Sequence, residues 1–246
     1  MVSETCDKPN ESPQLEWLEG DVPRSPQFQD TYFSMDGGLE ETRHVFLDGN
    51  RLPDRWVGQD RFTIGELGFG TGLNFLTTLL TLSEQQTAPK LTFLSFELYP
   101  LSLDQLAKAL AVWPQLSELS TQLLANWQPS PGWNRWQIAG HELLLGIGDA
   151  RQLMQHAGAE LSGAQSAPSA SVDAWYLDGF APSRNPELWQ LDLLQQVCSL
   201  TTPGGTLATY TAAGWVRRNL SAAGFTIEKT KGFSGKREMV IGRKPD

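Results

Sequence analysis

The residues best suited to chemistry follow an apolar run at positions 62–67, where three glycines stand at alternate positions: Gly68, Gly70 and Gly72. Glycine tolerates positive φ angles and lets a ligand approach the backbone. A helical pattern from Leu73 onward would add the free N–H groups of a helix N-terminus. A dinucleotide-binding turn would need glycine where this chain has Leu73. Glu66 would repel a pyrophosphate but attract an ammonium group, such as the amino-acid end of S-adenosylmethionine. The alternative interpretation is a glycine-rich turn beside a solvated acid.

Three further carboxylates stand at the ends of later apolar runs: Glu97, Asp149 and Asp178. Because ligands of an open α/β sheet bind at the carboxyl ends of its strands, we expect these acids and Glu66 to converge on one rim. Glu97 could accept both hydroxyls of a ribose, and Asp149 could accept the amino group of adenine. Such a rim suits a cationic nucleoside better than a phosphate. Each acid taken alone would more often be a helix cap or a solvated side chain.

The segment 178–189 begins with Asp178 and carries two aromatic residues and two prolines, one of them in an Asn-Pro pair. A rigid polar loop beside a methyl donor is what an amine acceptor would need. The Asp178 carboxylate could orient the N–H groups of an amine so that its lone pair faces the methyl carbon. The candidate substrate contacts of this loop are Phe180, Pro182 and Asn185. The alternative for Asp178 is an Asx-turn that ends a strand.

Strand and helix patterns alternate from residue 62 onward. Strands are expected at 62–67, 91–97, 142–147, 172–177, 206–211, 226–229 and 238–241, with a hairpin partner at 136–138. Helices are expected at 73–83, 102–113, 116–127, 150–159, 186–200 and 215–223. This alternation predicts an α/β fold, with a mostly parallel sheet and helices on both faces. The last two strands have no helix between them and should pair antiparallel.

The region before this pattern differs in composition. Residues 1–27 hold four prolines among polar residues, and we expect a loosely ordered lead-in. Residues 28–60, with the turn Asp36-Gly37-Gly38, should form an N-terminal extension packed on the main domain, which spans 61–246. Small residues at 162–171 are expected to form a mobile loop.

Composition narrows the class of protein. The 246 residues are 40% hydrophobic but contain no apolar run of roughly 18 residues, so no transmembrane helix is expected. Residues 1–10 lack the basic and apolar regions of a secretory signal. With Cys6 and Cys198 far apart, a reduced, cytoplasmic protein is the simplest interpretation. The three histidines are scattered, and we expect no metal.

Charge is distributed unevenly along the chain. The net charge is −9, but residues 217–246 carry +5, which leaves −14 on residues 1–216. A basic patch on an acidic body suits a polyanion held at one place and excluded elsewhere. The candidate phosphate contacts are Arg217, Arg218, Lys236 and Arg237. A solvated basic face is the alternative.

Four motifs together resemble one known family. They are the stretches 66–75 (ELGFGTGLNF), 172–182 (VDAWYLDGFAP) with Asn185-Pro186, 203–209 (PGGTLAT) and 236–239 (KREM). These resemble the methyltransferase domain of the MnmC family, the tRNA 5-methylaminomethyl-2-thiouridine biosynthesis bifunctional proteins. The likeness runs from about Tyr32 to Gly242, and residues 33–46 resemble the N-terminal signature of the family.

The resemblance implies a class I, Rossmann-like methyltransferase fold with seven strands, an antiparallel C-terminal strand, and S-adenosylmethionine as cofactor. It implies methylation of the aminomethyl group on the wobble uridine of tRNA, in the cytoplasm, with Asp178 as the catalytic residue facing the amine. The cofactor would be held by Glu66, Gly68, Phe69, Gly70, Gly72, Asn74, Glu97, Asp149 and Asp178.

One departure from the family pattern limits the expected function. Bifunctional members continue into an FAD-dependent oxidase, whereas this sequence ends at Asp246 without a second glycine fingerprint. We therefore expect either a standalone methyltransferase or a fragment, with an oxidase domain or protein supplying the aminomethyl substrate. Two alternatives remain: an aminopropyltransferase acting on a polyamine, and a tRNA-binding module without catalysis.

Overall fold

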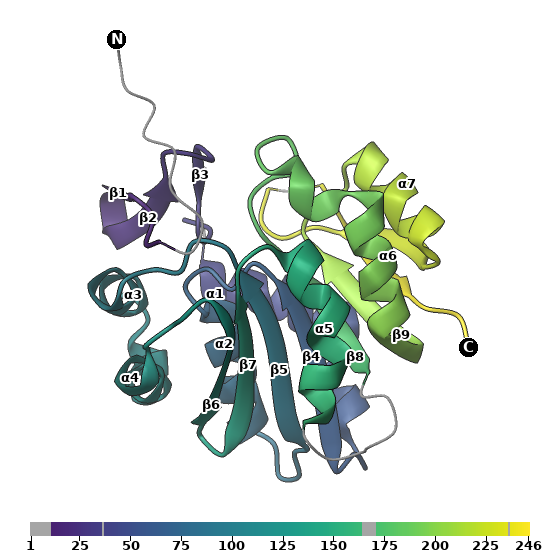
Figure 1. Cartoon of the computed structure of the whole chain (residues 1–246), viewed down its shortest axis with the longest axis horizontal. Coiled ribbons are helices and arrows are strands. Elements are labelled where there is room, and N and C mark those ends of the chain that lie inside the picture. Colours follow the sequence, from purple (N-terminus) through teal and green to yellow (C-terminus); the bar gives the residue numbers. More distant parts are fainter. Residues whose placement is uncertain (1–10, 36, 164–170, 236) are drawn as a thin grey trace.

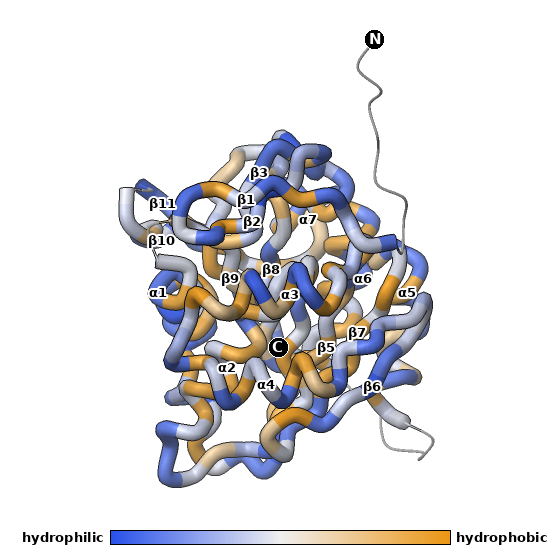
Figure 2. The backbone as a smooth tube through the Cα atoms, turned by 90° about the vertical axis from the view of Figure 1, so that its left-hand side faces the viewer, coloured by the Kyte–Doolittle hydropathy of each residue, from blue (hydrophilic) through white to orange (hydrophobic). Residues whose placement is uncertain are grey.

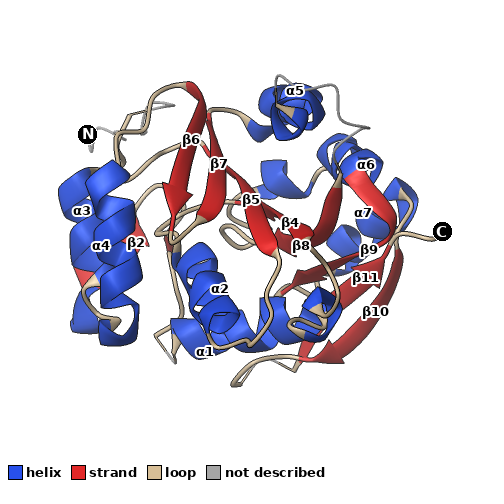
Figure 3. Cartoon of the chain, turned by 90° about the horizontal axis from the view of Figure 1, so that it is seen from below, coloured by secondary structure: helices blue, strands red, loops and turns tan. Residues whose placement is uncertain are grey.

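The computed structural model describes residues 11–35, 37–163, 171–235 and 237–246. Within these residues the strands form one eight-stranded sheet and one small three-stranded sheet. The large sheet lies between two layers of helices, as Figure 1 and Figure 3 show. The expected mobile loop at 162–171 falls mostly outside the described residues.

The order of the large sheet is β10-β11-β9-β8-β4-β5-β7-β6. In that order its strands are Thr226–Lys231, Glu238–Arg243, Thr201–Thr209, Val172–Leu177, Arg61–Leu67, Lys90–Glu97, His141–Ile147 and Gly132–Ile138. The five strands from β9 to β7 run parallel, while β6 pairs antiparallel with β7, and β11 pairs antiparallel with both β9 and β10. The predicted α/β class and its mostly parallel sheet are confirmed. Within the described residues the large sheet has eight strands, not seven, because the hairpin partner expected at 136–138 begins at Gly132 and joins the sheet as β6.

The register of the parallel strands determines which strand ends are neighbours. Leu67, the last residue of β4, pairs with Leu177 at the end of β8, so Gly68 and Asp178 follow side by side. Glu97 at the end of β5 pairs with Ile147 at the end of β7, which brings Gly148 beside it. All four chain segments therefore leave the sheet at one edge.

Helices cover the two faces of the sheet and bury two separate apolar clusters. One face carries α1 (Gly38–Thr42), α2 (Leu73–Ser83), α3 (Leu103–Leu110) and α4 (Ser117–Asn126), and the other carries α5 (Ala150–Ser162), α6 (Leu191–Leu200) and α7 (Gly214–Ala223). Neighbouring strand residues face opposite clusters: Phe93 packs in the first and Leu94 in the second. Such strands are apolar on both faces, as parallel strands between helix layers must be.

The colouring by hydropathy follows this burial. α2 is mostly hydrophobic in Figure 2, and nine of its eleven residues are buried. α3 alternates between hydrophilic and hydrophobic residues, as a helix with one buried face does. None of the helices in the described residues is long and apolar enough to cross a membrane.

One expected helix is interrupted near a proline: the helix expected at 186–200 is a 3-10 turn, Pro186–Trp189, followed by α6. Pro114 separates the helices expected at 102–113 and 116–127, and it opens a 3-10 turn, Pro114–Leu116, before α4. The strand expected at 206–211 begins earlier, at Thr201, because the segment around Gly204 continues β9 with a shift in its register against β8.

The N-terminal region contains more structure than a loosely ordered lead-in. Two short strands, β1 (Glu16–Leu18) and β2 (Val22–Ser25), pair with each other, and β2 pairs with β3 (Asp30–Thr31). Short helical turns at Arg43–Leu47, Asp48–Asn50 and Asp54–Trp56 follow α1. Residues 1–10 and Asp36 lie outside the described residues. The extension is packed on the domain, since Leu39, Phe46 and Trp56 belong to the first apolar cluster.

Candidate active site

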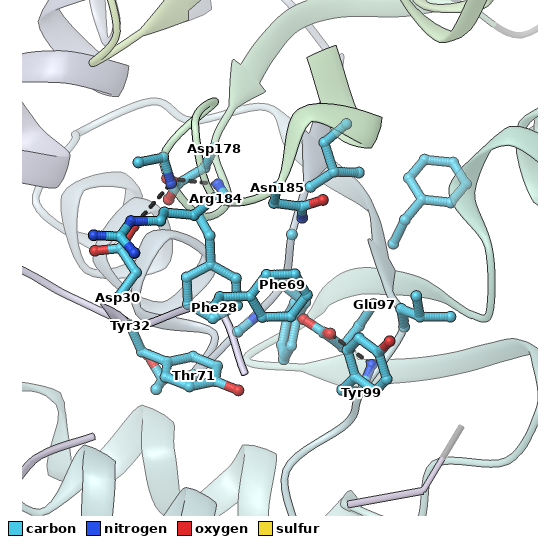
Figure 4. A pocket seen from close by; sticks show the side chains of 18 of the residues that line it. Phe28, Asp30, Tyr32, Phe69, Thr71, Glu97, Tyr99, Asp178, Arg184 and Asn185 are labelled. Atoms are coloured by element: carbon cyan, nitrogen blue, oxygen red, sulfur yellow. Dashed lines mark hydrogen bonds between the residues drawn. The ribbon is translucent and has the colours of Figure 1, made fainter. Parts of the chain in front are cut away.

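A cavity of about 640 Å³ opens at the carboxyl edge of the sheet. Its walls come from the turns after β4, β5, β7 and β8, and from residues 27–46 of the N-terminal extension. Of the residues proposed from the sequence, nine line it: Gly68, Phe69, Gly70, Asn74, Glu97, Asp149, Asp178, Phe180 and Asn185. In Figure 4, Asp178, Asp30 and Arg184 lie on one side of the view and Glu97 and Tyr99 on the other.

The glycine turn after β4 has the backbone that its composition predicts. Gly68, Gly70 and Gly72 have φ angles of 86°, 54° and 70°, which side chains rarely adopt. A Cβ at Gly68 would lie 3.1 Å from the Cα of Gly179, and one at Gly70 would lie 3.3 Å from the Tyr32 ring. The backbone of the turn is thus open at Gly68 and Gly70, while Phe69 and Thr71 line the cavity beside them. Gly72 does not line the cavity and is the N-cap of α2.

Glu97 ties the glycine turn to the end of β5. One of its carboxylate oxygens accepts a hydrogen bond from the Gly70 N–H at 2.8 Å, and the other accepts one from the Tyr99 N–H at 2.8 Å. Burial raises the pKa of Glu97, and these backbone hydrogen bonds oppose the rise. Each oxygen keeps a further lone pair with which to accept a ligand hydroxyl.

Asp149 caps α5 and is held by its neighbour Arg151. Its carboxylate accepts hydrogen bonds from the Arg151 backbone N–H at 2.9 Å and from the Arg151 guanidinium at 2.8 Å and 3.2 Å. Hydrogen bonds from the Arg151 side chain lower the pKa of Asp149. Arg151 also reaches Glu187 across the cavity rim at 3.5 Å. Asp149 is therefore ionised and aimed along the rim, but a ligand amino group there would compete with Arg151.

Glu66 is placed differently from the other acids. It has no exposed surface and does not line the cavity, so it cannot touch a ligand in this structure. Its carboxyl group accepts hydrogen bonds from the Ser95 hydroxyl at 2.6 Å and from the Asn74 amide at 2.9 Å. The expected rim of four acids is therefore three acids, with Glu66 behind it, because α2 and the end of β5 cover the side chain.

Burial raises the pKa of Glu66 well above its usual range, although hydrogen bonds from Ser95 and Asn74 oppose the rise. The folded protein therefore keeps a proton that the unfolded chain releases near the ordinary pKa of 4.5. Since the folded state keeps this proton, the contribution of Glu66 to the free energy of unfolding falls as pH rises above 4.5.

We expect Glu66→Gln, which is neutral at every pH, to remove this contribution above pH 4.5. Urea unfolding at a series of pH values measures it. Glu118→Gln, at an exposed site on α4, is the control and should keep the wild-type slope. An unchanged slope in Glu66→Gln would contradict the buried neutral carboxyl.

Asp178 opens the turn after β8. One carboxylate oxygen accepts the N–H of Gly179 at 2.8 Å, and the other accepts the Asn74 amide at 2.7 Å. The bond from Gly179 comes from the next residue, whereas an Asx-turn bonds the backbone two residues on, and the side chain lines the cavity. Gly179 in turn contacts the glycine turn at Gly68 and accepts a hydrogen bond from the Tyr210 hydroxyl at 2.9 Å. Asp178 is therefore fixed directly beside the glycine turn.

The N-terminal extension supplies a wall that sequence patterns did not reveal. Phe28 stacks on Phe180 with ring centroids 4.6 Å apart, and the Tyr32 ring meets Phe180 edge-on at 5.1 Å. The Asp30 carboxylate accepts the Ala181 N–H at 2.8 Å. Gln27 donates to the Tyr99 hydroxyl at 3.1 Å, so the segment 27–32 spans the cavity from the β5 turn to the β8 turn. Its concentration of aromatic residues was the available signal.

The remaining predicted residues lie outside the cavity. Pro182 is buried, whereas Arg218 and Arg237 are exposed. Arg217, Arg218 and Lys229 line a separate shallow hollow on the surface. Lys236 lies outside the described residues. No group of three or more His, Cys, Asp or Glu side chains in the described part of the chain could hold a metal ion.

Comparison with known proteins identifies the family of the chain. A family model described as S-adenosyl-L-methionine-dependent methyltransferase matches residues 114–245, more than half of the chain. The chain belongs to this methyltransferase family. The match favours methyl transfer over aminopropyl transfer and over a module without catalysis, and it makes S-adenosylmethionine the cofactor.

Individual relatives agree with the family model. The chain is 46% identical over 241 residues to the tRNA 5-methylaminomethyl-2-thiouridine biosynthesis bifunctional protein MnmC of Aeromonas salmonicida, and 47% identical over 237 residues to that of Methylobacillus flagellatus. These matches cover 94% and 93% of the chain but 35% and 34% of the relatives. The chain thus spans about a third of their length.

Solved structures confirm the fold. MNMC2 from Aquifex aeolicus superposes with a TM-score of 0.71 at 21% identity, covering 97% of this chain and 74% of that one. Spermidine synthase from Thermotoga maritima gives a TM-score of 0.50 at 11% identity, covering 96% of this chain and 74% of that one. At these identities the likeness concerns the fold alone.

The residues of the cavity fit S-adenosylmethionine. The glycine turn leaves room for the amino-acid end of the cofactor. The N-terminus of α2 has no side-chain cap, so its backbone N–H groups can bind that end. Glu97 lies beside that turn with acceptor capacity for ribose hydroxyls. Tyr99 and the exposed edge of Asp149 lie farther along the same wall, where an adenine ring would reach. The acidic rim also favours a sulfonium cation.

Proposed function

We propose that this methyltransferase methylates the aminomethyl nitrogen of 5-aminomethyl-(2-thio)uridine at the wobble position of tRNA, giving 5-methylaminomethyl-2-thiouridine. The names of the relatives at 46% and 47% identity support this substrate. The observation that carries it is the contact between the Asp178 turn and the glycine turn, where the Cα of Gly179 lies 3.1 Å from the Cβ position of Gly68. An amine held by Asp178 would lie next to the donor.

S-adenosylmethionine supplies a methyl group on a sulfonium sulfur. The residues of the chain must present a neutral amine to it, since only the neutral form has a lone pair for attack. The Asp178 carboxylate accepts N–H groups and directs the lone pair toward the cofactor side of the cavity. As the nitrogen gains the methyl group it becomes cationic, and the carboxylate stabilises that charge. A proton then leaves the product amine.

A wobble uridine must leave the stack of the anticodon loop to reach this cavity. Unstacked bases bind on aromatic side chains. Phe28, Tyr32 and Phe180 line the cavity next to Asp178, and their packing makes one aromatic wall. We propose that this wall takes the pyrimidine ring, with Asn185 at its edge.

A basic patch lies on the same edge of the sheet as the cavity. Thr209 of β9 precedes Tyr210, which lines the cavity, and Thr209 pairs with Val240, which pairs with Lys229. Lys231, the last residue of β10, and Arg237, which precedes β11, therefore lie at the cavity edge of the sheet. A hydrogen bond from Lys229, together with the charges of Arg217 and Arg237, lowers the pKa of Glu238, so these cations surround one acid. We propose that the patch holds tRNA phosphates.

Replacing Arg218 and Arg237 together with alanine should weaken tRNA binding about tenfold at physiological salt and reduce the slope of log K against log salt by about 2. Both side chains are exposed, so the fold should not change. Filter binding at several salt concentrations measures the slope.

The control removes two exposed cations at the opposite edge of the sheet. Arg61 and Lys90 pair at the starts of β4 and β5, and Arg61→Ala with Lys90→Ala should leave the slope unchanged. Equal slopes for wild type and the Arg218/Arg237 double variant would remove the patch from the tRNA interface.

The aminomethyl substrate needs a source. The relatives are named bifunctional, and this chain matches about a third of their length. We propose that an FAD-dependent oxidase, as a domain or a separate protein, supplies the aminomethyl group in the cytoplasm, where tRNA modification takes place.

Mass spectrometry of tRNA nucleosides tests the proposal. The protein and S-adenosylmethionine are incubated with tRNA carrying 5-aminomethyl-2-thiouridine. We expect a gain of one methyl group on that nucleoside, which is absent when the tRNA carries unmodified uridine. Methylation of another nucleoside, or of none, would overturn the proposed substrate.

A further inference from the structure

Asn74 occupies the centre of a buried polar network beneath the cavity. It lies in the first turn of α2 and is 8% exposed. Its amide nitrogen donates to the Glu66 carboxyl on β4 at 2.9 Å and to the Asp178 carboxylate after β8 at 2.7 Å. Both amide protons are thereby used. The side chain of Asn74 consequently links α2 to β4 and to the turn after β8.

The orientation of this amide follows from its neighbours. The reversed orientation would turn the amide oxygen toward Asp178, and two acceptors would then face each other. On its other side the amide oxygen accepts the Thr42 hydroxyl at 2.7 Å, closer than the Gly38 carbonyl that the same hydroxyl reaches at 3.0 Å. Glu66, Asp178 and Thr42 thus specify one orientation. With its protons used in this way, Asn74 has little capacity left to bind a cofactor directly, which was its role in the sequence prediction.

We propose that Asn74 is a positioning residue for Asp178: its amide holds the carboxylate directed at the acceptor amine, while Thr42 and Glu66 hold the amide. This inference rests on the proposed function of Asp178. Asn74 then takes part in the chemical step by orienting Asp178, and Thr42 on the N-terminal extension supports it through the amide oxygen.

The arrangement has a consequence for pH dependence. A donated hydrogen bond favours the ionised form of a carboxylate, so removing the Asn74 donor raises the pKa of Asp178. Other charged and titratable groups near Asp178 are Glu66 on β4, Asp30 and Glu41 on the N-terminal extension, Arg184 on the same turn, and Tyr210 after β9. If the ionised carboxylate is required, the acidic limb of the kcat profile moves to higher pH in the variants.

Four variants test the inference. Asn74→Asp keeps the shape and replaces the donor with an acceptor. Thr42→Val removes the hydroxyl that holds the amide, and Thr42→Ser restores it. Thr77→Val is the matched control, since Thr77 is a fully buried residue of α2 whose hydroxyl has no hydrogen-bond partner within the described residues.

We expect kcat to fall about a hundredfold in Asn74→Asp and about tenfold in Thr42→Val. The dissociation constant of S-adenosylmethionine, measured by calorimetry, should change less than about threefold in both. The acidic limb should move up by about half a pH unit or more in both variants. Thr42→Ser should recover most of the rate, and Thr77→Val should match wild type.

A second measurement does not depend on turnover. In protein labelled with ¹³C-aspartate, the Asp178 carboxyl signal is assigned by its loss in Asp178→Asn and titrated in wild type and variants. We expect a higher pKa for Asp178 in Asn74→Asp and Thr42→Val than in Thr77→Val. Equal titrations would overturn the positioning role even if wild type proves inactive on tRNA. A wild type that transfers no methyl group, with the shifted titrations present, would instead overturn the proposed substrate and leave the network intact.

Discussion

Asp178→Ala is expected to lower kcat for methyl transfer by about a thousandfold while changing the affinity for S-adenosylmethionine less than about threefold. The two effects differ because of where Asp178 lies. Asp178 lines the cavity beside the glycine turn, and its carboxylate accepts hydrogen bonds from Gly179 and Asn74. Single-turnover kinetics with calorimetry on the same samples separates the two effects.

Asp60→Ala is the control for this variant. Asp60 is exposed and precedes β4, so it lies at the opposite edge of the sheet from the cavity. Its replacement should alter neither quantity. If Asp178→Ala weakens cofactor binding as much as it slows transfer, Asp178 belongs to the cofactor site and the acceptor role is wrong.

Glu97→Ala should have the opposite pattern, with the cofactor dissociation constant raised about a hundredfold. The variant has no carboxylate to accept the N–H groups of Gly70 and Tyr99, so the glycine turn and the turn after β5 are no longer held together. The acceptors for ribose hydroxyls are lost at the same time. Calorimetric titration with S-adenosylmethionine measures the change directly.

At saturating cofactor, kcat of Glu97→Ala should return to within about tenfold of wild type, because the part of the cavity around Asp178 that holds the amine is unchanged. Glu118→Ala, an exposed acid on α4, is the control and should bind the cofactor normally. Wild-type affinity in Glu97→Ala would place the cofactor away from the end of β5.

The strand ends were predictable from the sequence because a buried parallel strand and its following turn are local patterns. The glycine turn, Glu97 and Asp178 all lie where their positions after apolar runs indicated. The different place of Glu66 was not predictable in this way. Whether an acid at a strand end faces the cavity or the helix layer depends on how α2 packs, and that packing joins residues distant in the sequence.

The N-terminal extension shows the same limit. Residues 27–32 have no helical or strand periodicity long enough to read, and their contacts are with residues around Tyr99 and Phe180, far along the chain. Their part in the cavity arises from tertiary packing alone. By contrast, the place of Asp149 as the cap of α5 was within reach of the sequence, since an Asp directly before a helical pattern is a common N-cap.

A crystal structure of the protein soaked with S-adenosylmethionine shows directly where the cofactor binds. We predict its amino-acid end over Gly68–Gly70, its ribose at Glu97, and its methyl group facing Asp178. Density for the cofactor at another place, such as the shallow hollow at Arg217 and Lys229, would contradict it.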